Sequence, residues 1–229
     1  MSEPVLVFCR QWPVTVTLDA LLAPVYADGV LPLYTRESLC RALRDYPCSP
    51  LVLGLSPHEH VMELYRLQEW LHGRPVLFVA RHFYWTDYRL PGFFGVERVQ
   101  FCTWRGLSDA ATRRTVLRRF RKLAAEEILN GPQKEKGLSS GKLLGMVNTW
   151  LYEQMADRNL SLTERTILLL LADNQRGNLP ARELSLYRVG GLRKLGMSKH
   201  IICLYRGVKI RPELQAELLS EKVKRKEPV

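Results

Sequence analysis

The feature that most limits the fold of this chain is a series of short apolar runs in its first half. They lie at residues 5–8, 50–55, 75–80 and 96–101, and residues 26–34 offer one more. Strands of a parallel sheet are buried on both faces, so they are continuously apolar instead of alternating. The runs therefore predict a parallel sheet.

Helical patterns fall between these runs, at residues 35–46, 59–71 and 108–123. In the last pattern, Ser108 is the expected N-cap and Asp109 lies in the first turn. Strands and helices in alternation predict a doubly wound α/β domain. The chain has 229 residues, which is enough for this domain and a second, smaller one.

A change of composition separates the two halves. Residues 130–142 are rich in Gly, Ser, Pro and charge and have no apolar period, which is typical of a linker. Residues 143–157 follow with an amphipathic helical pattern, either packed on its own domain or forming a dimer helix. The expected division is an α/β domain at 1–128, a linker and helix at 129–158, and an all-α domain at 159–229.

The last segment has the pattern of a helix-turn-helix. Ser161 and Glu164 have the spacing of a capping box at the start of a helix. A second helical pattern at 182–195 is interrupted by Gly190 and Gly191, and a tight turn then precedes a third helix at 199–210. Two helices joined by a tight turn, with the second one capped, are typical of DNA-binding helix-turn-helix domains.

This segment resembles the LuxR/FixJ (GerE-type) helix-turn-helix family. The resemblance rests on a capped start with an apolar run, and on the turn with the helix that follows it. The matching residues are Leu160, Ser161, Glu164, Ile167, Leu168, Leu170, Leu171 and Ala172, and then all residues from Leu195 to Arg206. The sequence departs from the family in a longer segment at 178–189 and in the Gly190-Gly191 pair, which puts the phosphate contacts of the second helix in doubt.

The first half is similar to a response-regulator receiver in strand order and rhythm, but not in its chemistry. The receiver's acidic pair falls near Cys9 and Arg10, and its phosphoacceptor Asp falls on Gly54 or Leu55. Its Thr or Ser falls near Ala80, and its Lys falls near Cys102 or Thr103. Phosphoryl transfer needs a carboxylate nucleophile and carboxylates to hold Mg²⁺, and none of these positions carries a carboxylate. The resemblance implies a pseudo-receiver. The whole chain looks most like atypical receiver-plus-LuxR-type regulators of enteric bacteria that control fimbriae, capsule and related surface structures.

The charge of the chain favours an anionic partner. Lys and Arg number 34 against 23 Asp and Glu, which gives a formal net charge of +11. Nucleic acid is the usual partner of such a basic protein. The alternative is a merely basic surface. The basic tail at 222–226 would add sequence-independent affinity or only solubility.

The expected DNA-binding residues lie around the turn and on the third helix. Lys199 and Arg206 are the candidates for reading base edges, and Arg193 and Lys194 for contacting phosphates. The full candidate set is Ser198, Lys199, His200, Cys203, Arg206, Lys209, Arg193 and Lys194. A helical period places Cys203 and Leu204 with Lys199 and Arg206 on the outer face, and Ile201, Ile202, Tyr205 and Val208 toward the core.

Other patterns leave alternatives open. Residues 113–122 carry six cations, which form either a docking surface for DNA or an acidic partner or a solvated helix face. The aromatic residues at 84–94 form either an interface or a cover over the sheet edge. His58 and His60 have the spacing of a metal pair without further ligands, so a surface loop is the expectation.

No catalytic, metal or cofactor site is expected. Five cysteines without CxxC spacing indicate a reducing cytoplasm, and no membrane segment is expected. The expected location is the cytoplasm, in association with the nucleoid. The leading hypothesis is a sequence-specific transcription regulator that binds double-stranded DNA as a homodimer or heterodimer and acts without phosphorylation. The alternatives are an auxiliary regulator that binds a partner regulator and has little DNA specificity, an enzyme, or a non-specific nucleoid protein.

Overall fold

The computed structural model describes residues 3–26, 28–125, 138–175 and 179–216. Its five-stranded sheet is parallel throughout, with the order β2-β1-β3-β4-β5. The strands are β1 (Val5–Phe8), β2 (Val30–Leu33), β3 (Leu51–Leu53), β4 (Val76–Ala80) and β5 (Val99–Thr103). This order is one of the two common arrangements of a doubly wound sheet, and the α/β prediction is confirmed.

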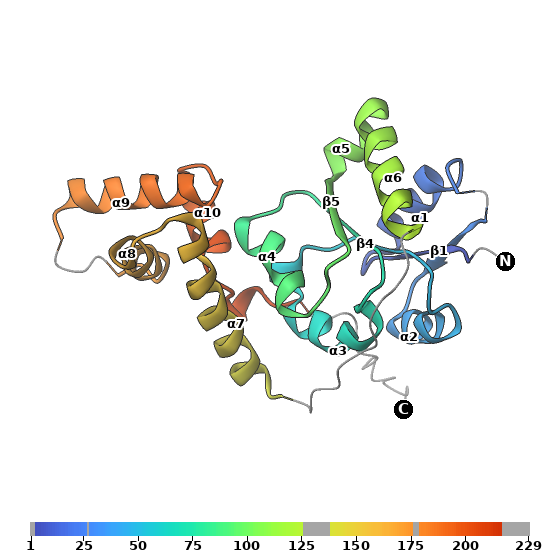
Figure 1. The fold of residues 1–229 in the computed structure, drawn as a ribbon, viewed down its shortest axis with the longest axis horizontal. Coiled ribbons are helices and arrows are strands. Elements are labelled where there is room, and N and C mark those ends of the chain that lie inside the picture. The colour runs from blue at the N-terminus through green and yellow to red at the C-terminus, as the bar shows by residue number, and fades with distance from the viewer. Residues whose placement is uncertain (1–2, 27, 126–137, 176–178, 217–229) are drawn as a thin grey trace, which may run out of the picture.

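Helices cover both faces of the sheet (Figure 1). They are α1 (Trp12–Leu22), α2 (Arg36–Asp45), the 3-10 turn η1 (Pro57–Glu59), α3 (Val61–Leu71), α4 (Trp85–Phe93), α5 (Trp104–Ser108) and α6 (Ala110–Ala125). Successive side chains of a strand point to opposite faces. Val5 and Val7 accordingly pack with α1 and α6, whereas Leu6 and Phe8 pack with α2 and α3.

Three elements of this half differ from the expectation. Helices α1 and α4 were not predicted, because α1 is rich in β-branched residues and α4 contains Pro91, features that disfavour a helix locally. Strand β5 begins three residues later than expected. Ser108 ends α5, so it is not the cap of the next helix; the Asp109 carboxylate instead accepts a hydrogen bond from the Thr112 amide at 2.7 Å.

The rest of the described chain is helical. It contains α7 (Ser140–Gln154), η2 (Ala156–Arg158), α8 (Leu162–Ala172), α9 (Ala181–Lys194), α10 (Ile201–Gly207) and η3 (Pro212–Leu214). Helix α7 begins inside the expected linker, most of which lies outside the described residues, as does the tail at 222–226. Within the described part of the chain, no helix is both long and apolar enough to cross a bilayer.

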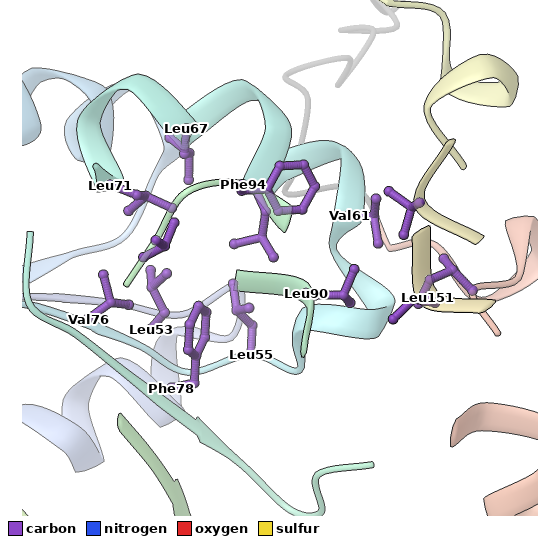
Figure 2. Packing of buried hydrophobic residues seen from close by; sticks show 14 of the residues in the cluster. Leu53, Leu55, Val61, Leu67, Leu71, Val76, Phe78, Leu90, Phe94 and Leu151 are labelled. Atoms are coloured by element: carbon purple, nitrogen blue, oxygen red, sulfur yellow. The ribbon is translucent and has the colours of Figure 1, made fainter. Parts of the chain in front are cut away.

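One apolar cluster joins the α/β half (residues 3–125) to the helical half (residues 138–216). Figure 2 shows the side chains that run from Val76 and Phe78 of the sheet, past Leu90 and Val61, to Leu151 of α7. Helix α7 contacts both α3 and α4. It therefore packs against the α/β half, and the two halves share buried apolar surface instead of being connected only through the chain.

Candidate nucleic-acid interface

Helices α8 and α9 pack closely because of one glycine. A Cβ atom at Gly191 would lie 2.7 Å from Cδ1 of the buried Leu168, so a larger residue would collide there. A Cβ at the adjacent Gly190 would meet nothing within 4 Å. Helix α9 runs through both glycines without a break, which corrects the expected interruption. Gly191 is therefore explained by helix packing.

The turn after α9 is fixed by its backbone. Gly196 has φ +73°, a conformation that glycine adopts without steric cost. Its amide donates to the carbonyl of Arg193 at 2.9 Å, and the Met197 amide donates to the carbonyl of Leu192 at 2.8 Å. This pair of bonds is the Schellman motif, which ends a helix and reverses the chain. The turn thereby sets the direction of α10.

Helix α10 differs from the expectation in its length and its orientation. It begins at Ile201, so Ser198, Lys199 and His200 lie in the preceding turn. Ile201 and Ile202 are exposed, by 66% and 45%, and Tyr205 is also exposed; only Val208 of the four expected core residues is buried. The helix buries Leu204 and Gly207 against its neighbours instead. The helical period was correct, but the face assigned to the core was wrong.

Seven of the eight candidate residues fall into two groups, and the eighth, Cys203, is half-buried on α10. The first group is exposed and forms no ion pair within the described residues; it lies at the end of α9 and in the turn: Arg193, Ser198, Lys199 and His200. Of these, Ser198 has its hydroxyl 3.2 Å from Sγ of the half-buried Cys203. The second group, Lys194, Arg206 and Lys209, forms ion pairs within the chain. We name the exposed cationic and imidazole residues, Arg193, Lys199 and His200, the turn surface.

Two of these ion pairs hold the helical half together. The Lys194 ammonium lies 2.7 Å from the Glu164 carboxylate and also donates to the carbonyl of Asn159. Partial burial raises the pKa of Glu164, but hydrogen bonds from Lys194 and Ser161 outweigh it and hold this pKa below its ordinary value. Lys209 pairs with Asp173 at the end of α8. Both lysines therefore have structural partners in this arrangement.

The third ion pair joins the two halves. The Arg206 guanidinium on α10 pairs with the carboxylate of Glu59, next to α3. Thr86 of α4 donates its hydroxyl to the carbonyl of Arg206 at 3.4 Å. The side-chain amide of Gln215 donates to the carbonyl of His58 and accepts from the Val61 amide. We call this set, Glu59, Thr86, Arg206 and Gln215, the inter-half contact.

Buried polar residues position Glu59. The Asp87 carboxylate accepts hydrogen bonds from the backbone amides of His58 and Tyr84, at 2.8 and 2.7 Å, and lies 2.8 Å from Nδ1 of His58. Asp87, His58 and His60 are buried, so the expected surface loop at the two histidines is wrong. No group of three metal-ligating side chains occurs in the described part of the chain. His58 therefore anchors the turn that presents Glu59.

At the carboxyl edge of the sheet, Cys9 fills the space beside Gly54. A Cβ at Gly54 would lie 2.8 Å from Cβ of Cys9, so no larger residue fits there without rearrangement. The Cys9 thiol donates to the carbonyl of Gly54 at 3.0 Å, and burial raises its pKa. A raised pKa disfavours the nucleophilic thiolate. The side chains here fill space and offer neither a carboxylate nor an activated thiol.

The aromatic stretch partly covers the sheet edge. Trp85 and Phe94 are buried, whereas Tyr88 is 53% exposed. The rings of Phe83 and Tyr88 lie 5.1 and 4.8 Å from the ring of Phe101 on the edge strand β5. Most of the stretch therefore folds back over the sheet. Among its aromatic residues (Tyr84, Trp85, Tyr88, Phe93 and Phe94), Tyr88 alone is largely exposed.

Comparison with known proteins found one similar solved structure and no match to a family model or a curated protein. No family model matches the sequence, and no curated protein matches it. Among solved structures, full-length FixJ from B. japonicum is similar. The match has 16% sequence identity, covers 90% of this chain and 96% of that chain, and has a TM-score of 0.39. A likeness of this size carries no argument about function, which therefore rests on the residues described above.

The sequence did not indicate the inter-half contact. Its partners are 120 to 157 residues apart in the chain. Glu59 and Thr86 belong to no motif, and their role depends entirely on how the two halves pack. Gln215 lies beyond the matched helix-turn-helix residues. A pattern of local spacing carries no signal for contacts of this kind.

Proposed function

We propose that this chain is a sequence-specific DNA-binding transcription regulator that acts as a dimer, without phosphorylation of its α/β half. The observation that carries the proposal is the turn surface. Arg193, Lys199 and His200 are exposed at the end of α9 and in the turn before α10. Exposed cations beside a short helix suit contacts to phosphates and base edges in a major groove. The net charge of +11 supports an anionic partner.

In this proposal the inter-half contact opposes the binding of α10 to DNA. Arg206, the second candidate for base reading, is paired with Glu59 in the described arrangement. Helix α10 also contacts α4, and a Cβ at Gly207 would lie 3.2 Å from Cβ of Tyr84. Release of Arg206 therefore precedes its use on DNA, whereas Lys199 is available without it.

The sheet edge supports the proposed independence from phosphorylation. The resemblance places the phosphoacceptor at Gly54 or Leu55; the surroundings of Gly54 are filled by Cys9, and Leu55 is a buried aliphatic residue. Aspartate at position 54 would collide with Cys9. In this proposal, expression level, a partner or a ligand sets the activity in place of phosphate.

A second candidate function has one observation in its favour. Ile201 and Ile202 are exposed at the start of α10, and exposed aliphatic residues are more typical of protein interfaces than of phosphate contacts. The second candidate is an auxiliary regulator that binds another regulator through this surface and has little DNA specificity of its own.

Selection of DNA sites from a random library with the purified full-length chain separates the two candidates. The proposal predicts an enriched motif made of paired half-sites about 10 base pairs apart, the spacing at which a two-fold dimer meets successive major grooves. Enrichment of no motif, with binding that weakens uniformly as salt rises, would contradict the proposal and support the auxiliary regulator.

A further inference from the structure

The outer face of α6 is strongly positive. Four cations lie along it at intervals of four, three and one residues, and we name them the α6 basic face: Arg114, Arg118, Arg121 and Lys122. All four are exposed. On a helix with 3.6 residues per turn, these positions fall on one side. They span about two turns, or roughly 12 Å along the axis.

These charges are not neutralised within the described chain. None of the four forms an ion pair among residues 3–26, 28–125, 138–175 and 179–216. Arg114 donates to the carbonyl of Ala110, one turn earlier in its own helix. Asp109, at the helix start, accepts from the Thr112 amide and attracts Arg114 without forming an ion pair with it. Among the described residues, the repulsion between these cations is thus largely left to solvent ions or to a bound anion.

The same face has no apolar centre. Leu117 and Phe120 are buried against the sheet, and the other side chains on the face of the cations are small: Ala111, Thr115 and Ala125. Protein interfaces are organised around buried aromatic or aliphatic anchors, and charged residues are depleted from their centres. Surfaces that bind DNA are more polar and much more positive. The composition of this face fits a phosphate backbone better than it fits a protein.

The location of α6 keeps it available. Figure 1 shows α6 over the α/β half, whereas α9 and α10 lie toward the opposite end of the long axis. The inter-half contact involves α4, η1 and the start of α3, and none of the four cations takes part in it. The α6 basic face is therefore exposed while Arg206 is still paired with Glu59.

We propose that the α6 basic face binds the phosphate backbone of double-stranded DNA without regard to sequence, as a second contact separate from α10. The inference rests on the proposed function in one respect, that DNA is the partner. It adds a way for the chain to hold DNA before α10 is released. Contacts of this kind contribute affinity and salt dependence but no specificity.

The test compares Arg118→Gln/Arg121→Gln with Arg41→Gln/Arg44→Gln in the full chain. The control pair removes two exposed cations from α2, so both double variants change the net charge equally. Binding of a labelled random-sequence duplex is measured by fluorescence anisotropy over a range of salt concentrations. The slope of log K against log salt should become shallower by about 1.8 for the α6 variant, two lost phosphate contacts at about 0.9 each. The slope of the control pair should stay near that of the wild type.

Equal slopes for both double variants would overturn the proposal and leave an acidic protein as the occupant of this face. The outcome is separable from that of the proposed function. Substitution of α6 should leave any selected DNA motif unchanged, whereas substitution of Lys199 should alter it. A chain that selects no motif but loses salt dependence in the α6 variant would retain this inference and refute sequence reading by α10.

Discussion

Substitution of Glu59 by glutamine tests whether the inter-half contact restrains DNA binding. The change removes the charge that holds Arg206 but keeps Arg206 itself for DNA. Both side chains are about one-third exposed, so the pair is worth roughly 0.2–1 kcal/mol, as for other solvent-exposed ion pairs. If the paired arrangement predominates, apparent affinity scales with the fraction of released chains, and this energy corresponds to a gain of about 1.4- to 5-fold.

The assay is a titration of a selected duplex, with Glu69→Gln as the control. Glu69 is an exposed carboxylate on α3, so its substitution changes the net charge by the same amount without touching Arg206. Glu59→Gln should bind more tightly than Glu69→Gln, and the gain should shrink at high salt, because salt screens an exposed ion pair. Equal affinities for the two variants would refute the restraint.

Three further predictions concern the stability of the helical half, measured as the free energy of unfolding in urea. Gly191→Ala should destabilise the protein by about 1–3 kcal/mol, because the new Cβ would lie 2.7 Å from a buried leucine. Gly190→Ala should stabilise it by about 0.5–1 kcal/mol, because a Cβ there meets nothing within 4 Å. Equal effects would contradict the packing account. Ser161→Ala should cost about 0.5–2 kcal/mol, since its hydroxyl accepts from the Glu164 amide, and an unchanged value would argue against the cap. Lys194 helps to depress the pKa of Glu164, so the pair stabilises the protein above the ordinary glutamate pKa, and this stability is lost as pH falls through the depressed pKa. Glu164→Gln should flatten this loss of stability at acid pH. An unaltered pH profile would count against the pair.

The parts of the fold that depend on local pattern were predictable. Continuous apolar runs gave the strands, and the spacing of Ser161 and Glu164 gave the start of α8, where the capping box is present. Helix α4 was missed because Pro91 lies inside it and its helical form depends on Trp85 and Leu90 being buried against the sheet. Local propensity opposed this helix, and tertiary packing decided it.

The candidate interface was predictable only in part. The position of the turn followed from Gly196 and its neighbours, but the face of α10 did not follow from its composition. Ile201 and Ile202 are apolar, so periodicity assigned them to the core, yet Gly207 and Leu204 make the contact. The glycine permits close approach to Met197 in the preceding turn and to Tyr84 on the other half. No helical pattern includes Tyr84, because it lies more than a hundred residues away.

The most direct test of the central claim is the specificity ratio of Lys199→Ala beside Lys142→Ala. Both lysines are exposed, and Lys142 lies in the first turn of α7, away from the turn surface. Affinities for the selected duplex and for a scrambled duplex are measured at one salt concentration. The account predicts that Lys199→Ala lowers the ratio of the two affinities by the equivalent of about 1–3 kcal/mol, whereas Lys142→Ala leaves the ratio unchanged. The same ratio in both variants would contradict a sequence-reading role for the turn before α10.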